Sequence, residues 1–283
     1  MRYFKMNGAG NDFVIFDARP YGALNLSPEQ ARAIADRSKG IGCDQVIAIE
    51  RSIRGDAFMR IWNSSGEEVG ACGNGARAVG WLLLEEGLGR PAKIETAAGL
   101  LSAADAGRNR VSVDMGSPLL KWEEIPVARA TDTVRMEYSA PGPYAAEWGL
   151  VGPGGVNMGN PHAVFIVDDV DAMPVAEIGP LIERDPFFPE GVNVGFVTVR
   201  SRTALRSRVW ERGAGLTKAC GTGACAAVVA ATRIGLVDRM AELTLDGGVL
   251  EIEWRAKDDR VIMTGPVELD GEDELADPAA LAV

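Results

Sequence analysis

Two cysteines, Cys72 and Cys220, lie in the same short motif, Cys-Gly-x-Gly-Ala, in the two halves of the chain. Each motif follows a glycine-containing loop and precedes an apolar stretch that is typical of a helix. The N–H groups and the dipole at a helix N-terminus stabilise anions, so they are expected to lower the pKa of a thiol and to hold a carboxylate. The pattern therefore predicts two activated thiols beside anion-binding backbone.

Two equivalent thiols suit the inversion of a carbon stereocentre by proton transfer. One group must remove the α-proton, and an acid on the opposite face must return another. A single cysteine before a helix is more often a small buried hydrophobe, but cysteine repeated within one glycine-rich frame favours a catalytic pair. The glycines of the two motifs are expected to let the backbone approach a ligand; they are Gly73, Gly75, Gly221 and Gly223.

The second half of the chain repeats the first at an offset of 148 to 150 residues. Residues 60–76 align with residues 208–224 without a gap, with seven identities in seventeen positions. The register continues to Asn11 with Asn160 and to Gln45 with Asn193. We therefore predict two similar domains, residues 1–117 with about 266–283, and residues 118–265, packed so that Cys72 opposes Cys220 across a cleft.

Each half is predicted to be mostly β with one prominent helix. Alternating apolar residues indicate strands at residues 12–17, 45–50, 57–62, 162–167, 193–199 and 205–210, and residues 243–252 indicate a hairpin. Helices are predicted at 74–86 and 222–234, each stopped by a glycine, and a capping box begins another at Ser27. The fold class is α/β (α+β): two pseudo-symmetric domains from an internal duplication, each a β-sheet wrapped around a prominent helix, with the active site in the cleft between them.

Composition narrows the functional class. Of 283 residues, 47% are hydrophobic and 24% charged, which is ordinary for a globular protein, and the formal charge of −11 argues against general nucleic-acid binding. No N-terminal secretory pattern or apolar run of about 18 residues is present, so we expect a cytoplasmic protein without a membrane partner. The single histidine and the absence of a Cys-x-x-Cys pair argue against zinc, and Cys43 and Cys225, without register partners, are expected to be structural.

At these residues the chain resembles the diaminopimelate epimerase family, which is part of the pyridoxal-phosphate-independent racemase and epimerase superfamily. The resemblance extends over nearly the whole length and is carried by several separate motifs. They lie at residues 5–13, 40–45, 62–63, 71–77, 159–162, 192–196, 211–215 and 219–224. Ala9, Cys43 and Leu216 depart from the family pattern, and none of them removes a catalytic group.

The resemblance implies conversion of LL-2,6-diaminopimelate into the meso isomer, toward lysine and peptidoglycan, by a homodimeric enzyme without cofactor or metal. It gives Cys72 and Cys220 the base and acid roles, with His162 and Glu211 beside them to tune their protonation, although a lone histidine fits a structural role equally well. The positions that it assigns to substrate binding are Asn11, Gln45, Asn63, Gly73, Asn74, Asn160, Asn193, Arg212, Gly221 and Thr222. Asp12, Asp44 and Arg77 are motif residues for which we expect a structural role.

The residues leave two other functions possible. One is a racemase of another amino acid, such as proline, hydroxyproline or histidine, and the other is a redox-sensitive amino-acid-binding protein. Asn63, Asn193 and Arg212 favour a substrate with a distal amino acid group, because leaving such groups buried and unpaired costs roughly 1–3 kcal/mol each. Arg212 is suited to clasp a distal carboxylate with two hydrogen bonds, whereas its register partner Ser64 is not.

Overall fold

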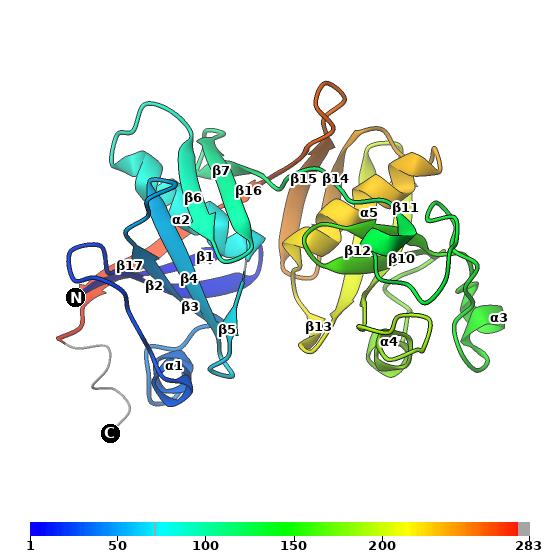
Figure 1. Cartoon of the computed structure of the whole chain (residues 1–283), viewed down its shortest axis with the longest axis horizontal. Helices are drawn as coiled ribbons and strands as arrows, with labels where there is room; N and C mark the ends of the chain where they lie inside the picture. The colour runs from blue at the N-terminus through cyan, green and yellow to red at the C-terminus, as the bar shows by residue number, and fades with distance from the viewer. Residues whose placement is uncertain (71, 277–283) are drawn as a thin grey trace. The chain divides into compact units, whose positions relative to one another are not determined.

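The computed structural model describes residues 1–70 and 72–276. The chain divides into two compact units, the first formed by Met1–Asp114 with the segment from Thr264 onward, and the second by Met115–Met263 (Figure 1). Ala71 of the first cysteine motif and residues 277–283 of the predicted first domain lie outside the described residues. Both units are mixed α/β structures in which strands predominate and helices are few.

Unit 1 is a run of paired strands with two helices. Its strands are β1 (Arg2–Gly8), β2 (Asn11–Asp17), β3 (Gln45–Glu50), β4 (Ala57–Asn63), β5 (Glu68–Val69), β6 (Ala92–Thr96), β7 (Gly99–Asp105), β8 (Arg110–Asp114) and β17 (Glu268–Glu274), and its helices are α1 (Pro28–Ala35) and α2 (Gly73–Glu85). The pair β2–β3 and the pair β4–β6 are parallel, whereas β1–β17, β1–β2, β3–β4, β6–β7 and β7–β8 are antiparallel. The helix α2 packs against β1, β6, β7 and β8.

Unit 2 repeats this order of pairings. Its strands are β9 (Gly154–Asn157), β10 (Pro161–Ile166), β11 (Asn193–Ser201), β12 (Ala204–Glu211), β13 (Gly215–Thr217), β14 (Met240–Leu245) and β15 (Gly248–Trp254), while β16 (Val261–Pro266) spans the boundary of the units and pairs with β8. Its helices are α3 (Tyr144–Trp148), α4 (Val175–Glu183) and α5 (Gly221–Arg233), with a 3₁₀ turn at Trp122–Glu124. The pairs β10–β11 and β12–β14 are parallel, whereas β9–β10, β11–β12, β12–β13 and β14–β15 are antiparallel, so β9-β10-β11-β12-β14-β15 has the same succession of directions as β1-β2-β3-β4-β6-β7. This repeated topology agrees with the duplication in the sequence.

The predicted strands and the two prominent helices are found within two residues of their expected bounds, and the predicted hairpin begins three residues earlier than expected, at Met240. The two prominent helices begin one residue earlier than predicted, because Cys72 and Cys220 take the N-cap positions and the following glycine becomes the first helical residue. Gly87 and Gly235 follow these helices with φ of 83° and 74°. The helix α4 was not predicted, since Pro180 lies inside it and a proline normally argues against a helix interior.

Local signals explain where α1 and the β14–β15 hairpin form. The Ser27 hydroxyl accepts from the Gln30 N–H at 3.3 Å, and the Gln30 side chain accepts from the Ser27 N–H at 2.7 Å, which confirms the predicted capping box. The hairpin turns between Leu245 and Gly248, as predicted. Each prominent helix buries nearly all of its first ten residues, so the core of each unit surrounds the helix that begins at its cysteine.

Candidate active site

Cys72 is the N-cap of α2 in unit 1. Its backbone is extended, with φ −145° and ψ 114°, and its Sγ accepts the Gly75 N–H at 3.3 Å. Gly73 and Asn74, the first two helical residues, are buried, while Cys72 itself is half-buried. The thiol therefore lies against the N–H groups of the first helical turn, as the motif predicted.

Cys220 is the N-cap of α5 in unit 2 and has the same contact, because its Sγ accepts the Gly223 N–H at 3.3 Å. The Thr222 hydroxyl lies 3.5 Å from the same sulfur, and Cys220 is only 5% exposed. Its neighbour Gly221 is the first helical residue and is buried. Both thiols therefore occupy one local geometry, each within its own unit.

The pKa of Cys220 differs from the expectation. Burial raises the pKa of this thiol well above its usual value, and the negative charge of Glu211 raises it further, whereas the Thr222 hydroxyl and the Gly223 N–H lower it. The prediction that the helix N-terminus lowers the thiol pKa toward neutrality is wrong for Cys220, because burial and Glu211 outweigh the helix. Cys220 is consequently a protonated thiol at neutral pH, which is the form of a proton donor.

The structure gives the second glycine of each motif a packing role inside its own unit. A Cβ at Gly75 would lie 2.7 Å from Ile47 Cδ1 on β3. A Cβ at Gly223 would lie 3.0 Å from Val209 Cγ2 on β12 and 3.2 Å from Cys220 Sγ. These distances are tighter than ordinary carbon contacts of about 3.5–4.0 Å. Glycine at these positions thus lets the first turn of each helix lie directly on a central strand.

Four of the predicted substrate-binding residues come together in two pairs in unit 1. The Asn74 Nδ2 donates to Asn11 Oδ1 at 2.5 Å, and the Gln45 Nε2 donates to Asn63 Oδ1 at 2.8 Å. Asn11, Gln45 and Asn63 are half-buried, and Asn74 is buried. Within the part of the chain that the structure describes, Gln45 Oε1 is buried and has no hydrogen-bond partner. That oxygen is therefore an acceptor that a ligand donor could satisfy.

Charged side chains hold the segments that carry Asn11 and Gln45. Asp12 accepts from Lys5 at 2.7 Å and from both Nη atoms of Arg37, while Arg37 also donates to Asp44 at 2.7 Å. The Asp44 N–H donates to Asp12 Oδ1 at 3.0 Å, and the Asp12 N–H donates to Asp44 Oδ2 at 3.2 Å. Burial raises the pKa of Asp12, but the hydrogen bonds from Arg37 and Lys5 prevail and lower it. This network joins the start of β2 to the residue before β3.

His162 lies at the start of β10 and is fully buried in unit 2. Its Nε2 lies 3.0 Å from Asn160 Oδ1, so Nε2 carries the proton in this contact. Burial, followed by the positive charge of Arg212, lowers the pKa of His162 to about 3. Among the described residues its Nδ1 has no hydrogen-bond partner. The imidazole is therefore neutral at physiological pH and acts as a donor to Asn160.

Asn193 and Arg212 are neighbours in unit 2, but Asn193 is largely engaged by the protein itself. The Asn193 Oδ1 accepts the Arg212 N–H at 2.9 Å, and its Nδ2 donates to the Pro161 carbonyl at 2.8 Å. The Arg212 guanidinium is exposed and donates to the Glu190 carbonyl at 2.8 Å. Arg212 is thus the accessible cation of this group, whereas buried Asn193 fixes the backbone that carries it.

Thr217 was not predicted as a site residue, although its hydroxyl donates to Glu211 Oε1. It lies on β13 opposite Val209 of β12, which places it on the same face of the hairpin as Glu211. A hairpin predicted at the Gly213–Gly215 turn would have paired the strand that carries Thr217 with the strand that carries Glu211. Thr217 therefore holds the carboxylate that raises the pKa of Cys220.

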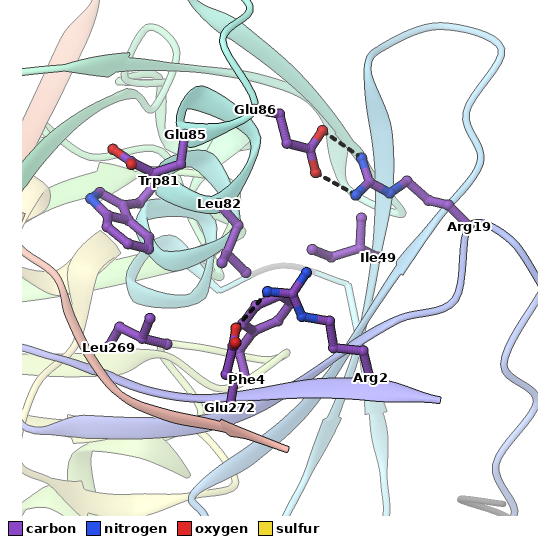
Figure 2. A pocket seen from close by; sticks show the side chains of 10 residues that line it. All are labelled: Arg2, Phe4, Arg19, Ile49, Trp81, Leu82, Glu85, Glu86, Leu269 and Glu272. Atoms are coloured by element: carbon purple, nitrogen blue, oxygen red, sulfur yellow. Dashed lines mark hydrogen bonds and ion pairs between the residues drawn. The ribbon is translucent and has the colours of Figure 1, made fainter. Parts of the chain in front are cut away.

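A cavity of about 280 Å³ lies in unit 1 beside the C-terminal half of α2, at the opposite end of the helix from Cys72 (Figure 2). It is lined by Arg2, Phe4, Arg19, Ile49, Trp81, Leu82, Glu85, Glu86, Leu269 and Glu272. The guanidinium groups at its edge are engaged, because Arg2 pairs with Glu272 and Arg19 with Glu86, both at 2.5 Å. None of the predicted site residues lines this cavity, so it is separate from the cysteine motifs.

Across residues 1–70 and 72–276, no group of three or more histidine, cysteine, aspartate or glutamate side chains is placed to hold a metal ion. In the same residues, no helix has the length and apolar character needed to cross a bilayer.

The fold is shared with solved structures described as epimerases. A predicted epimerase from Pseudomonas aeruginosa has the same fold, with a TM-score of 0.67 at 19% identity over 98% of this chain and 99% of that one. A hydroxyproline epimerase from Agrobacterium vitis, solved with bound trans-4-hydroxy-L-proline, has a TM-score of 0.65 at 18% identity over 100% of this chain and 94% of that one. At these identities the likeness concerns the fold alone.

Sequence comparison identifies the family. The family model described as diaminopimelate epimerase matches residues 3–121 and 155–269. A diaminopimelate epimerase from Phenylobacterium zucineum is 55% identical over 96% of this chain and 97% of its own length, and one from Acidiphilium cryptum is 50% identical over 99% and 98%. The chain therefore belongs to the diaminopimelate epimerase family and is an isomerase.

Proposed function

We propose that this enzyme converts LL-2,6-diaminopimelate into meso-diaminopimelate by proton transfer between Cys72 and Cys220, without a cofactor. The observation that carries the proposal is the 55% identity to a diaminopimelate epimerase over 96% of the chain. The matched geometry of the two thiols supports it, since each accepts one glycine N–H at the start of a helix. A reaction that inverts a stereocentre needs two such groups.

In the proposed reaction one cysteine, as thiolate, takes the α-proton, and the other, as thiol, gives its proton to the opposite face of the same carbon. The protons therefore balance, and the pair ends with its protonation states exchanged. The carboxylate at the reacting centre would rest on the N–H groups of Gly73 with Asn74 and of Gly221 with Thr222, where the helix N-termini stabilise the charge that develops. The raised pKa of Cys220 suits it to begin as the donor.

We propose that Glu211 and His162 assist Cys220 and its surroundings in different ways. The carboxylate of Glu211 raises the pKa of Cys220 and is itself held by Thr217. His162 is neutral and holds Asn160 in one orientation. Neither residue needs to exchange a proton with the substrate for these roles, so both are tuning or positioning groups in the proposed mechanism.

The remaining polar residues are proposed to recognise the two ends of the substrate. Gln45 offers a buried acceptor in unit 1, and the exposed guanidinium of Arg212 offers a cation for the distal carboxylate. Asn63 is held by Gln45, and Asn193 supports the Arg212 backbone. A substrate with an amino group and a carboxylate at each end satisfies these donors and acceptors better than a monocarboxylate does.

The biological setting is proposed from family membership. The product is a precursor of lysine and of peptidoglycan, and the enzyme is expected in the cytoplasm as a homodimer. Size-exclusion chromatography with light scattering tests the oligomeric state, because a homodimer has twice the 30.0 kDa mass of one chain.

The substrate is tested by incubating the reduced enzyme separately with LL-diaminopimelate, L-proline, trans-4-hydroxy-L-proline and L-histidine and resolving the stereoisomers by chiral chromatography. The proposal predicts turnover of LL-diaminopimelate alone, and loss of that turnover in both Cys72→Ala and Cys220→Ala. Cys43→Ala is the matched control, because Cys43 is a buried cysteine outside the two motifs. Turnover of another amino acid with none of diaminopimelate would overturn the substrate, and full activity in either motif variant would overturn the thiol pair.

A further inference from the structure

Arg77 is a charged residue of α2 that the proposed proton transfer does not use. Its side chain is 0% exposed, although arginine is rarely buried unless it is hydrogen-bonded. Its Nη1 donates to Asn74 Oδ1 at 2.8 Å. The register partner of Arg77 in the second half is Cys225, so only unit 1 places a guanidinium at this position.

The hydrogen bonds beyond Arg77 run in one direction. A guanidinium only donates, so Asn74 must turn its Oδ1 toward Arg77 and its Nδ2 away. The Nδ2 of Asn74 donates to Asn11 Oδ1 at 2.5 Å, which leaves Asn11 with its NH₂ group. That NH₂ group lies 3.4 Å from Asp44 Oδ2, and an ionised carboxylate only accepts. The donor at one end and the acceptor at the other therefore fix the same orientation of both amides.

We propose that Arg77 is a positioning residue that commits Asn11 to donate a hydrogen bond to a substrate carboxylate. This inference rests on the proposed function for the identity of the substrate. An NH₂ group is matched by a carboxylate, which accepts, and is not matched by the ammonium groups of an amino acid, which only donate. Without Arg77 only the longer 3.4 Å contact with Asp44 holds this orientation, so the two amides are freer to flip together, and a flipped Asn11 would turn an oxygen toward the carboxylate.

Unit 2 reaches the same polarity by a different side chain. Asn160, the register partner of Asn11, has its Oδ1 3.0 Å from His162 Nε2. With Oδ1 as the atom that faces the imidazole, Asn160 also keeps its NH₂ group for a ligand. Two unlike residues, Arg77 acting through Asn74 and His162 acting directly, thus set matched asparagines in the same sense.

The first test separates donation from acceptance at Asn11. Asn11→Asp puts an acceptor in place of the NH₂ group, and the proposal predicts that KM for LL-diaminopimelate rises on the order of 10-fold to 100-fold. Asn11→Ser, which is small and retains a donor, is the matched control and is expected to lose less. An unchanged or lower KM in Asn11→Asp would overturn the proposal, because a residue that receives an ammonium group gains from a carboxylate.

The second test asks whether Arg77 acts through Asn74. Arg77→Met is expected to raise KM on the order of 10-fold, Arg77→Lys to recover part of the loss, and Arg77→Met to add less than about twofold in an Asn74→Ala background. Losses that multiply would show that Arg77 acts only on the fold and would overturn the proposal. Circular dichroism confirms folding, and the Asn11 variants decide the matter if Arg77→Met does not fold.

A readout without turnover separates this inference from the proposed function. Solvent exchange of the Asn74 side-chain NH₂ hydrogens, followed by NMR in asparagine-labelled protein, is expected to accelerate at least about tenfold in Arg77→Met, because the hydrogen bond that fixes Asn74 Oδ1 is lost and the amide opens more often. If the wild type fails to epimerise diaminopimelate while this exchange accelerates, the proposed function fails and the positioning stands. Unchanged exchange in folded Arg77→Met would overturn the positioning, whatever the activity.

Discussion

Replacing Gly75 by alanine tests why the cysteine motif contains a second glycine. The added methyl would lie 2.7 Å from Ile47 Cδ1, about 1 Å inside an ordinary carbon contact, and Ile47 is 0% exposed with no solvent to move into. Overpacking of this kind costs about 1–3 kcal/mol. Alanine in place of glycine in a helix returns up to about 1 kcal/mol. The steric effect prevails, and we expect a net destabilisation of about 1 kcal/mol.

The matched background is Ile47→Val, which removes the atom that the new methyl would meet. In that background Gly75→Ala is expected to be neutral or stabilising by up to about 1 kcal/mol, because only the helix preference remains. Urea unfolding of the four proteins of this cycle, read as midpoint shifts at constant m, measures the coupling. The reasoning is refuted if Gly75→Ala has the same effect on the free energy of unfolding in both backgrounds.

Four further outcomes follow from individual contacts. His162, the single histidine, has its pKa lowered to about 3, so its NMR signals should not titrate between pH 8 and pH 5, and a midpoint near 6.5 would contradict its burial. Glu211→Gln should lower the pKa of Cys220 and speed the alkylation of Cys220 by iodoacetamide at pH 8, whereas the control Glu177→Gln, at an exposed residue, should change neither. Equal alkylation rates in the wild type and both variants would exclude the Glu211 carboxylate as a cause of the raised pKa. Asp12→Asn should destabilise the protein at pH 7, and because the folded pKa of Asp12 is lowered, this deficit should shrink as pH falls below about 4; a deficit independent of pH would rule out the ion pairs. Ser27→Ala should lower the free energy of unfolding by about 1 kcal/mol through loss of the α1 cap, and an unchanged melting temperature would show that the cap contributes nothing.

The local features of the fold could be predicted from the sequence because their causes are local. The capping box at Ser27, the hairpin after Leu243 and the helices that follow Cys72 and Cys220 each depend on a few adjacent residues. The duplication added the correspondence between elements of the two halves. The helix α4 was not predicted because Pro180 disfavours a helix interior. Packing of its apolar side chains in the core of unit 2 makes the helix favourable.

The electrostatics of the site depended on tertiary contacts and could not be predicted in the same way. A helix N-terminus at Cys220 indicates a lowered pKa, but burial and the carboxylate of Glu211 reverse the direction. The second glycines were explained by approach to a ligand, whereas Gly75 meets Ile47 across the unit's own core. The direction of the amide chain from Arg77 through Asn74 to Asn11 likewise emerges only when residues distant in sequence are placed together.

The central claim, proton transfer between two thiols, is tested most directly by the early time course in deuterated water. With LL-diaminopimelate as substrate, two-base transfer predicts that newly formed meso product carries deuterium at the inverted carbon while the remaining substrate keeps its hydrogen. Cys72→Ala and Cys220→Ala should each abolish product formation. Deuterium appearing at equal rates in substrate and product would indicate one base serving both faces, and it would contradict the account.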